Sequence, residues 1–334
     1  MPVTKYPLGL HMTLAAGMPG RYPEFARRAE ELGYGSLWMA EAGGADALVN
    51  LGSFAAMTSR LELATGVLPI QIRTPAAMAA AFLTLNDISN GRAIAGLGVS
   101  SPIIVERWHG ASYRKPLTAM RECVAIMRQL FTDGRAKFSG EIYKSDFRLG
   151  FRPAATPAPR IYLAALNAPM LRLAGEIADG VLLNYSPPDA VAAMAAEVRA
   201  GAETIGRNPD DVDIAIYIRM CITPDERNAM DAFKRELAGY SFVESYGKMF
   251  ARYGLSGEFA EVRRLWQAGK RDEAPSAISD ASVLRLAAFN TGDGRGMVAR
   301  FRAAGITRPV IFPVGPRETA EKSFAETITA MAGT

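Results

Sequence analysis

Short apolar runs alternate with longer segments of helical period along almost the whole chain, and this alternation constrains the fold most. The runs have the length of buried strands, and each is followed by a stretch whose apolar residues recur every three or four positions. Repeated strand–helix units are typical of parallel strands joined by helical crossovers. About eight such units close into a barrel, so the sequence predicts a (β/α)8 TIM barrel.

The predicted elements divide the chain into consecutive units. Strands are expected at 8–14, 36–40, 61–68, 92–97, 160–165, 180–183, 212–222 and 309–312. Helices are expected at 22–32, 46–59, 74–88, 115–131, 169–178, 189–205 and 320–331. Gly33 directly follows the first helical pattern, in the position where a glycine commonly ends a helix.

Two segments depart from the repeat. Residues 134–149 contain two short alternating runs around Gly140, which predicts a hairpin inserted before the fifth strand. Residues 240–279 form a mixed region with helical pieces, which we interpret as an excursion between strands seven and eight that covers one mouth of the barrel. Neither segment contains enough apolar residues for a core of its own, so a single domain over residues 1–334 is expected.

Composition argues against several classes of protein. The net charge is +4, and the basic residues are spread without the cluster that nucleic-acid binders carry. The excess fits a small anionic ligand in a local pocket. Two cysteines, two histidines and no CxxC are too few for a zinc site or a disulfide framework. With no signal peptide and no apolar stretch long enough to span a bilayer, a soluble cytoplasmic protein is expected.

Glycines at two predicted strand ends mark candidate binding segments, because barrel enzymes place their sites where strands end. The segment GLGVSSP at 96–102 lets backbone approach a planar ligand, and Ser101 can cap a helical turn there. A tight turn that needs small residues is the alternative. In TGVLPI at 65–70, Gly66 predicts either a bulge against which something packs or a kink before Pro69.

The segment IYLAALNAP at 161–169 runs from an apolar strand into a helix. Backbone amides of Ala165, Leu166 and Asn167 can hold a phosphate at the positive end of that helix. Asn167 can equally serve only as the helix cap.

Polar side chains near the strand ends supply candidates for proton transfer. Glu41 follows strand two and can accept a ligand hydrogen bond, act as a base, or cap the helix that begins near Asp46. Asp46 itself is expected to cap that helix. His109 lies past strand four and can shuttle protons or simply bond a backbone carbonyl. His11, inside strand one, points either into the barrel or outward toward the helices.

Four stretches together resemble the luciferase-like monooxygenase superfamily, in particular its deazaflavin-dependent branch. They are YGSLWMAEAGGADAL (34–48), LELATGVLPIQIRTPAAMA (61–79), LNDISNGRAIAGLGVSSP (85–102) and IYLAALNAPMLRLAGEIADGVLLN (161–184). The resemblance implies a cofactor laid across the strand ends, with its ring against the third strand. A non-proline cis peptide behind the ring is then expected at Gly66–Val67.

The resemblance also implies which residues surround this cofactor. The ring would lie against the third-strand segment, its border would come from the end of strand four, and the loop after strand five would bind the phosphate. These residues are Thr65, Gly66, Val67, Leu68, Gly98, Val99, Ser100, Ser101, Ala164, Ala165, Leu166 and Asn167. No metal is expected.

The implied activity is hydride transfer between coenzyme F420 and a small organic substrate. Relatives often carry a histidine after the acidic residue that follows strand two, whereas this chain has Glu41–Ala42. Glu41 is therefore expected as the polar partner near the ring, and His109 as the proton donor. His11 or a route without histidine are the alternatives for proton transfer.

Two rival functions keep the same barrel. One is an FMN-dependent monooxygenase, whose phosphate would occupy the same loop. The other is a flavin-binding barrel without turnover. Relatives also pair through the helices that flank strands two and three, which implies a homodimer.

Overall fold

Parallel strands close into a barrel in the computed structural model, which describes residues 6–12, 19–41, 43–154 and 156–334. The barrel strands are β1 (Gly9–His11), β2 (Ser36–Met39), β3 (Glu62–Thr65), β5 (Ala93–Gly98), β8 (Arg160–Ala164), β9 (Gly180–Leu183), β10 (Asp213–Met220) and β12 (Arg308–Pro313). Because β1 pairs with both β2 and β12, the first and last strands close the ring. The predicted (β/α)8 TIM barrel is confirmed. Positions 13 and 14 of the predicted first strand lie outside the described residues.

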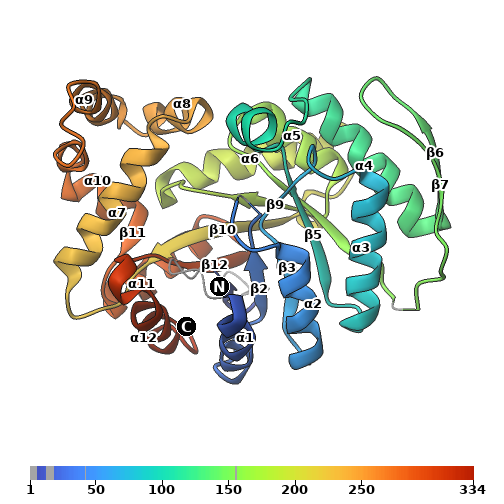
Figure 1. The fold of residues 1–334 in the computed structure, drawn as a ribbon, viewed down its shortest axis with the longest axis horizontal. Coiled ribbons are helices and arrows are strands. Elements are labelled where there is room, and N and C mark those ends of the chain that lie inside the picture. The colour runs from blue at the N-terminus through green and yellow to red at the C-terminus, as the bar shows by residue number, and fades with distance from the viewer. Residues whose placement is uncertain (1–5, 13–18, 42, 155) are drawn as a thin grey trace.

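Helices follow the strands and cover the outside of the barrel (Figure 1). They are α1 (Tyr22–Glu31), α2 (Ala47–Met57), α3 (Pro75–Ile88), α4 (Pro116–Asp133), α5 (Ala168–Ile177), α6 (Pro188–Thr204), α11 (Thr291–Ala303) and α12 (Ala320–Ala330). Gly33 follows α1 with a φ of +83°, the left-handed conformation that glycine adopts most easily. The sequence interpretation missed α11, whose first half contains three glycines that weaken a helical pattern.

Alternate residues of each strand point into the barrel, and the others pack against the helices. In β10, Ile216 and Ile218 lie in the core between barrel and helices, whereas Tyr217 lies in the barrel interior. Trp38 and Tyr162 share that interior with Tyr217, and their aromatic rings fill its middle. The strands are therefore apolar on both faces, as expected for a parallel sheet covered by helices.

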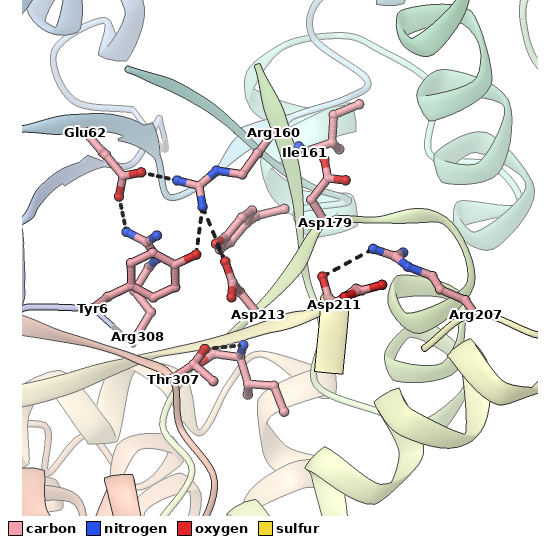
Figure 2. Close-up of polar contacts among 12 residues, drawn as sticks. Tyr6, Glu62, Arg160, Ile161, Asp179, Arg207, Asp211, Asp213, Thr307 and Arg308 are labelled. Atoms are coloured by element: carbon pink, nitrogen blue, oxygen red, sulfur yellow. Dashed lines mark hydrogen bonds and ion pairs between the residues drawn. The ribbon is translucent and has the colours of Figure 1, made fainter. Parts of the chain in front are cut away.

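Charged residues close the end of the barrel at which the strands begin (Figure 2). Glu62, Arg160 and Arg308 each open a strand, and the Glu62 carboxylate forms ion pairs with both arginines. Arg160 also lies 3.4 Å from the carboxylate of Asp213, the first residue of β10. The Arg308 guanidinium stacks 3.6 Å from the centre of the Tyr6 ring. Acidic and basic groups thus neutralise one another where water has little access.

The predicted hairpin and helical excursion lie at opposite ends of the molecule (Figure 1). The hairpin is formed by β6 (Arg135–Ser139) and β7 (Lys144–Arg148), within the predicted boundaries. At its turn, the backbone N–H groups of residues 141, 142 and 143 donate to the carboxylate of Glu122 in α4. This carboxylate anchors the hairpin to the barrel helices, because it accepts hydrogen bonds that the turn cannot satisfy internally.

The helical excursion is longer than predicted. It begins with α7 (Glu226–Tyr240), continues through α8 (Glu244–Arg252) and α9 (Ser256–Gln267), and ends with α10 (Asp280–Leu286). Phe233 and Leu237 of α7 are buried at helical spacing, a signal in the sequence that could have revealed this helix.

The excursion also buries more apolar surface than its composition suggested. Phe250 and Phe259 pack in one cluster with Tyr185, Cys221 and other residues of the barrel loops. This core is shared with the barrel rather than closed within the excursion, and the single domain remains a prediction. Among the helices of the described residues, none has the length and hydropathy to cross a membrane.

Removing the charge of Glu62 should destabilise the closed end of the barrel. Glu62→Gln leaves Arg308, which is almost fully buried, without its ion-pair partner, and we expect a loss of about 2 kcal/mol in urea unfolding. The exposed pair Arg21–Glu24 provides the control, because Glu24→Gln should cost less than about 0.5 kcal/mol. Equal losses in the two variants would show that the buried cluster does not stabilise the barrel.

Candidate functional site

Three small residues lie side by side where neighbouring strands end. A Cβ atom added to Gly98 of β5 would lie 2.4 Å from Val67 Cγ2 and 3.7 Å from the Cβ of Ala164 in β8. Strand pairing explains this proximity, because β5 pairs with both β4 (Leu68–Pro69) and β8. Glycine is required at position 98 because the Val67 side chain packs directly against its backbone. The predicted segments of strands three, four and five are thus brought together; we refer to Val67, Gly98 and Ala164 as the slot.

The peptide bond between Gly66 and Val67 is cis, as the resemblance implied. It lies between β3 and β4, so the predicted strand 61–68 is interrupted there by a bulge. The Tyr217 hydroxyl donates to the Gly66 carbonyl oxygen at 2.8 Å, and a Cβ on Gly66 would lie only 1.7 Å from that hydroxyl oxygen. On the other side, the Glu41 amide donates to the Val67 carbonyl oxygen. Only glycine fits at position 66 beneath Tyr217.

Two predicted contact residues turn their side chains elsewhere. The Thr65 hydroxyl donates to the Gly96 carbonyl oxygen at 2.7 Å and accepts from the Gly96 amide at 2.9 Å. The Leu68 side chain is fully buried in the core between the barrel and the helices. Near the slot, both residues can therefore offer only backbone atoms.

The loop after β5 forms a helical turn over the barrel mouth. Ser100 has a φ of +56°, and the Ser101 hydroxyl accepts a hydrogen bond from the Ile104 amide, as expected of a cap. The turn ends at Trp108, whose ring lies 3.2 Å from a Cβ placed on Gly43 in the loop after β2. His109 is the next residue, and its side chain is exposed at the rim.

The first turn of α5 lies beside the slot and follows the strand that ends at Ala164. The Asn167 side chain accepts a hydrogen bond from the Met170 amide, so the capping alternative is realised. The Ala165 amide donates to the Leu182 carbonyl oxygen at 3.3 Å and is therefore engaged in the barrel sheet. The amides of Leu166, Asn167 and Ala168 are the ones that an anion can use at this helix start, because Pro169 has no N–H and the Met170 amide bonds to Asn167.

Glu41 lies at the end of β2 in a network of charged groups. Arg73 donates to both Glu41 carboxylate oxygens at 3.2 and 3.3 Å, and the Ala47 amide of α2 donates to Glu41 at 3.3 Å. Arg73 also pairs with Asp46, which caps α2 as predicted. Hydrogen bonds from the Val49 amide and Arg73 lower the pKa of Asp46 although burial opposes this. Glu41 thus joins the end of β2, the loop after β4 and the start of α2.

His11 points into the barrel, which decides between its two predicted orientations. Its ring stacks on Phe312 with centroids 4.1 Å apart and meets the edge of Tyr217 at 4.8 Å. Burial lowers the pKa of His11 well below its ordinary value, and the nearby Arg219 lowers it further. The imidazole is therefore neutral near pH 7, which makes it a poor proton donor.

Arg219 is a buried residue of the mouth that the sequence interpretation missed. Its guanidinium lies between the rings of Tyr185 and Phe312, 3.9 Å from each centroid, and donates to the Asn184 side-chain oxygen. The Asn184 amide donates in turn to the Tyr246 hydroxyl of α8 at 2.8 Å. A charged residue within the apolar run IAIYIRM was the signal for it. This network fastens the helical excursion to the barrel mouth.

A surface hollow of about 710 Å³ lies elsewhere on the molecule. Its walls include Ile222, Asn290 and Glu326, from the segments after β10 and β11 (Ala287–Ala288) and from α12. None of the predicted site residues lines it. The slot is defined instead by strand pairing and by its glycine, so we place the candidate site there.

Comparison with known proteins agrees with this geometry. Residues 7–307 match the family model described as luciferase-like monooxygenase. The chain belongs to the luciferase-like monooxygenase family. It is an enzyme of that family.

Several relatives in the luciferase-like family are named for coenzyme F420. A Mycobacterium tuberculosis protein whose name provisionally assigns it to the coenzyme F420-dependent oxidoreductases is 32% identical, over 91% of this chain and 94% of its own. A 5,10-methylenetetrahydromethanopterin reductase of Archaeoglobus fulgidus is 30% identical, over 87% of this chain and 89% of its own. The solved coenzyme F420-dependent tetrahydromethanopterin reductase of Methanopyrus kandleri has a TM-score of 0.80 at 22% identity, covering 98% of both chains.

Substitutions at Gly66 and Tyr217 should show coupled effects on stability. We expect Gly66→Ala to cost about 2 kcal/mol, because its methyl group collides with the Tyr217 hydroxyl. Tyr217→Phe should cost about 1 kcal/mol through the lost hydrogen bond. In the double variant the collision is partly relieved, so urea unfolding should give a loss smaller than the sum of the two. Additive losses would contradict the contact.

His11 should make stability depend on pH. Because its pKa is lowered in the folded chain, the unfolded chain binds the extra proton below about pH 6.5. The contribution is complete above that pH and is lost as the pH falls, by up to about 1.4 kcal/mol per pH unit. His11→Phe, which keeps an aromatic ring against Phe312, should flatten urea-unfolding free energies measured between about pH 7 and pH 5. The exposed His109→Phe should leave the slope as in the wild type.

Proposed function

We propose that this enzyme transfers a hydride between coenzyme F420 and a small organic substrate. The observation that carries the proposal is the slot of Val67, Gly98 and Ala164 beside the first turn of α5. The small side chains of Val67 and Ala164, on either side of a glycine, would form a low surface against which a planar ring could lie. Support for this cofactor comes from relatives of similar length that are named F420-dependent, including a glucose-6-phosphate dehydrogenase of Kineococcus radiotolerans.

When bound, coenzyme F420 supplies the hydride chemistry, and the protein supplies position and surroundings. Val67, Gly98 and Ala164 would contact the ring, with Thr65, Gly66 and Leu68 contributing backbone around the bulge. Val99, Ser100 and Ser101 would border the ring. Backbone amides of Leu166 and Asn167 would bind the phosphate at the start of α5, where the helix dipole favours an anion, and Ala165 would line the approach.

Two side chains at the mouth would act on the bound molecules, one as a proton donor and the other as a hydrogen-bond acceptor. His109 is proposed as the proton donor, because its imidazole is exposed at the rim, whereas burial lowers the pKa of His11 and keeps that ring neutral. Glu41 is proposed as the polar partner of the ring. Its ion pair with Arg73 fixes the carboxylate at the mouth, which suits a hydrogen-bond acceptor better than a general base.

The helical excursion would exclude water from the reacting groups. Tyr185, Tyr240 and Tyr246 pack together between the barrel loops and helices α7 and α8. The buried Arg219 beneath them, which pairs with Glu236, would favour an electron-rich substrate group at the mouth. Opening of this excursion as a lid would admit the substrate.

Assembly and location are part of the proposal. Val49, Met57 and Ile88 are large apolar residues exposed on α2 and α3, the helices that flank strands two and three. Such a surface fits pairing of two copies of the chain. A cytoplasmic location agrees with Cys123 and Cys221, which are both free thiols.

Titration of the purified protein with coenzyme F420 and with FMN tests the cofactor. We expect quenching of deazaflavin fluorescence with a dissociation constant at least about tenfold below that for FMN, followed by oxidation of the reduced deazaflavin when carbonyl substrates are added. Gly98→Leu should weaken binding more than about tenfold, because its side chain would displace Val67 and disturb the slot. Gly257→Leu, at an open position of α9, is the matched control and should bind as the wild type does.

Other results would lead to different assignments. Binding of FMN alone would overturn the choice of coenzyme F420 and favour the monooxygenase. Binding of coenzyme F420 without turnover on any carbonyl substrate would favour a flavin-binding barrel that does not catalyse.

A further inference from the structure

Gln71 has a side-chain amide that the protein leaves unsatisfied. Its nitrogen and oxygen are both shielded from solvent, yet neither has a hydrogen-bond partner among the described residues. The other two glutamines differ: Gln129 accepts a hydrogen bond from the Lys137 amide, and Gln267 is exposed on the surface. A shielded amide without a partner is costly and rare in folded proteins, so its presence at a candidate site points to a missing ligand.

The backbone of Gln71 lies beside the slot, as the contacts of the residues before and after it show. Two residues before it, Pro69 pairs in register with Gly98, and the Ile70 amide donates to the Gly98 carbonyl oxygen at 3.0 Å. Two residues after it, Arg73 binds Glu41 at the end of β2. The backbone at position 71 is thus fixed between the glycine of the slot and the loop after β2.

We infer that the Gln71 amide binds the imide edge of the flavin-type ring. This inference rests on the proposed function and adds a side chain that forms hydrogen bonds with the ring. The pyrimidine part of a flavin or deazaflavin presents an N–H group between two carbonyl groups. A primary amide has one acceptor and two donors, so it can accept from that N–H while donating to a neighbouring carbonyl. A phosphate or an apolar group would satisfy at most half of the amide.

Binding measurements on Gln71→Leu test the inference directly. This variant is similar in size and lacks both polar atoms, so loss of the paired hydrogen bonds should raise the dissociation constant for coenzyme F420 about tenfold. The melting temperature of the cofactor-free protein should be unchanged or higher, because a shielded unpaired amide is removed. Gln267→Leu is the matched control and should change neither quantity.

A second measurement separates a direct contact from a general disturbance of the site. The deazaflavin core methylated on its imide nitrogen cannot donate the hydrogen bond to Gln71. Methylation should weaken binding to the wild type by about tenfold but have a much smaller effect on Gln71→Leu. Such non-additive losses in a double-mutant cycle would show that the Gln71 side chain contacts the ring.

The outcomes distinguish a failure of the role of Gln71 from a failure of the proposed function. Failure of the wild type to bind any flavin or deazaflavin would reject the proposed function. Wild-type binding of coenzyme F420 with equal binding by Gln71→Leu would reject only the role of Gln71. Equal losses on methylation in both proteins would likewise reject the contact, even if Gln71→Leu bound more weakly.

Discussion

The hydrogen bond from the Tyr217 hydroxyl to the Gly66 carbonyl oxygen crosses the barrel interior and holds the segment between β3 and β4 in place. Tyr217 belongs to β10, whereas Gly66 lies between β3 and β4, on another side of the ring of strands. The contact is possible only because position 66 carries no side chain. With this support, Val67 faces Gly98, and the small residues at three strand ends form one surface.

The two ends of the barrel balance charge in different ways. Where the strands begin, Glu62 and Asp213 neutralise Arg160 and Arg308, so the polar groups serve mainly stability. Where the strands end, Arg219 lies between two aromatic rings, and its nearest carboxylate, that of Glu236, is 3.8 Å away. At the mouth, Arg219 is therefore balanced by the Glu236 carboxylate and by the faces of the two aromatic rings.

The mouth itself is asymmetric, and this asymmetry suits a large planar ligand with a small reaction partner. One side has the slot and the start of α5, where the side chains are small. The other side has His11, Phe312 and the tyrosines that join the barrel to the helical excursion. In the proposed function, the small residues would lie against the ring, while the aromatic side would restrict the space for a substrate and limit the access of water.

The sequence by itself determined the barrel, its order of strands, and the place of the candidate site. Local patterns carry this information, because they depend on residues close in the chain. These patterns are the spacing of apolar residues, the glycines at strand ends, and helix caps such as Asn167 and Asp46. The tertiary structure alone decided which polar groups meet. It paired Glu41 with Arg73, turned Thr65 toward Gly96, and left the Gln71 amide unsatisfied. Such partners come from strands and loops distant in sequence, so only closure of the barrel brings them within hydrogen-bonding distance.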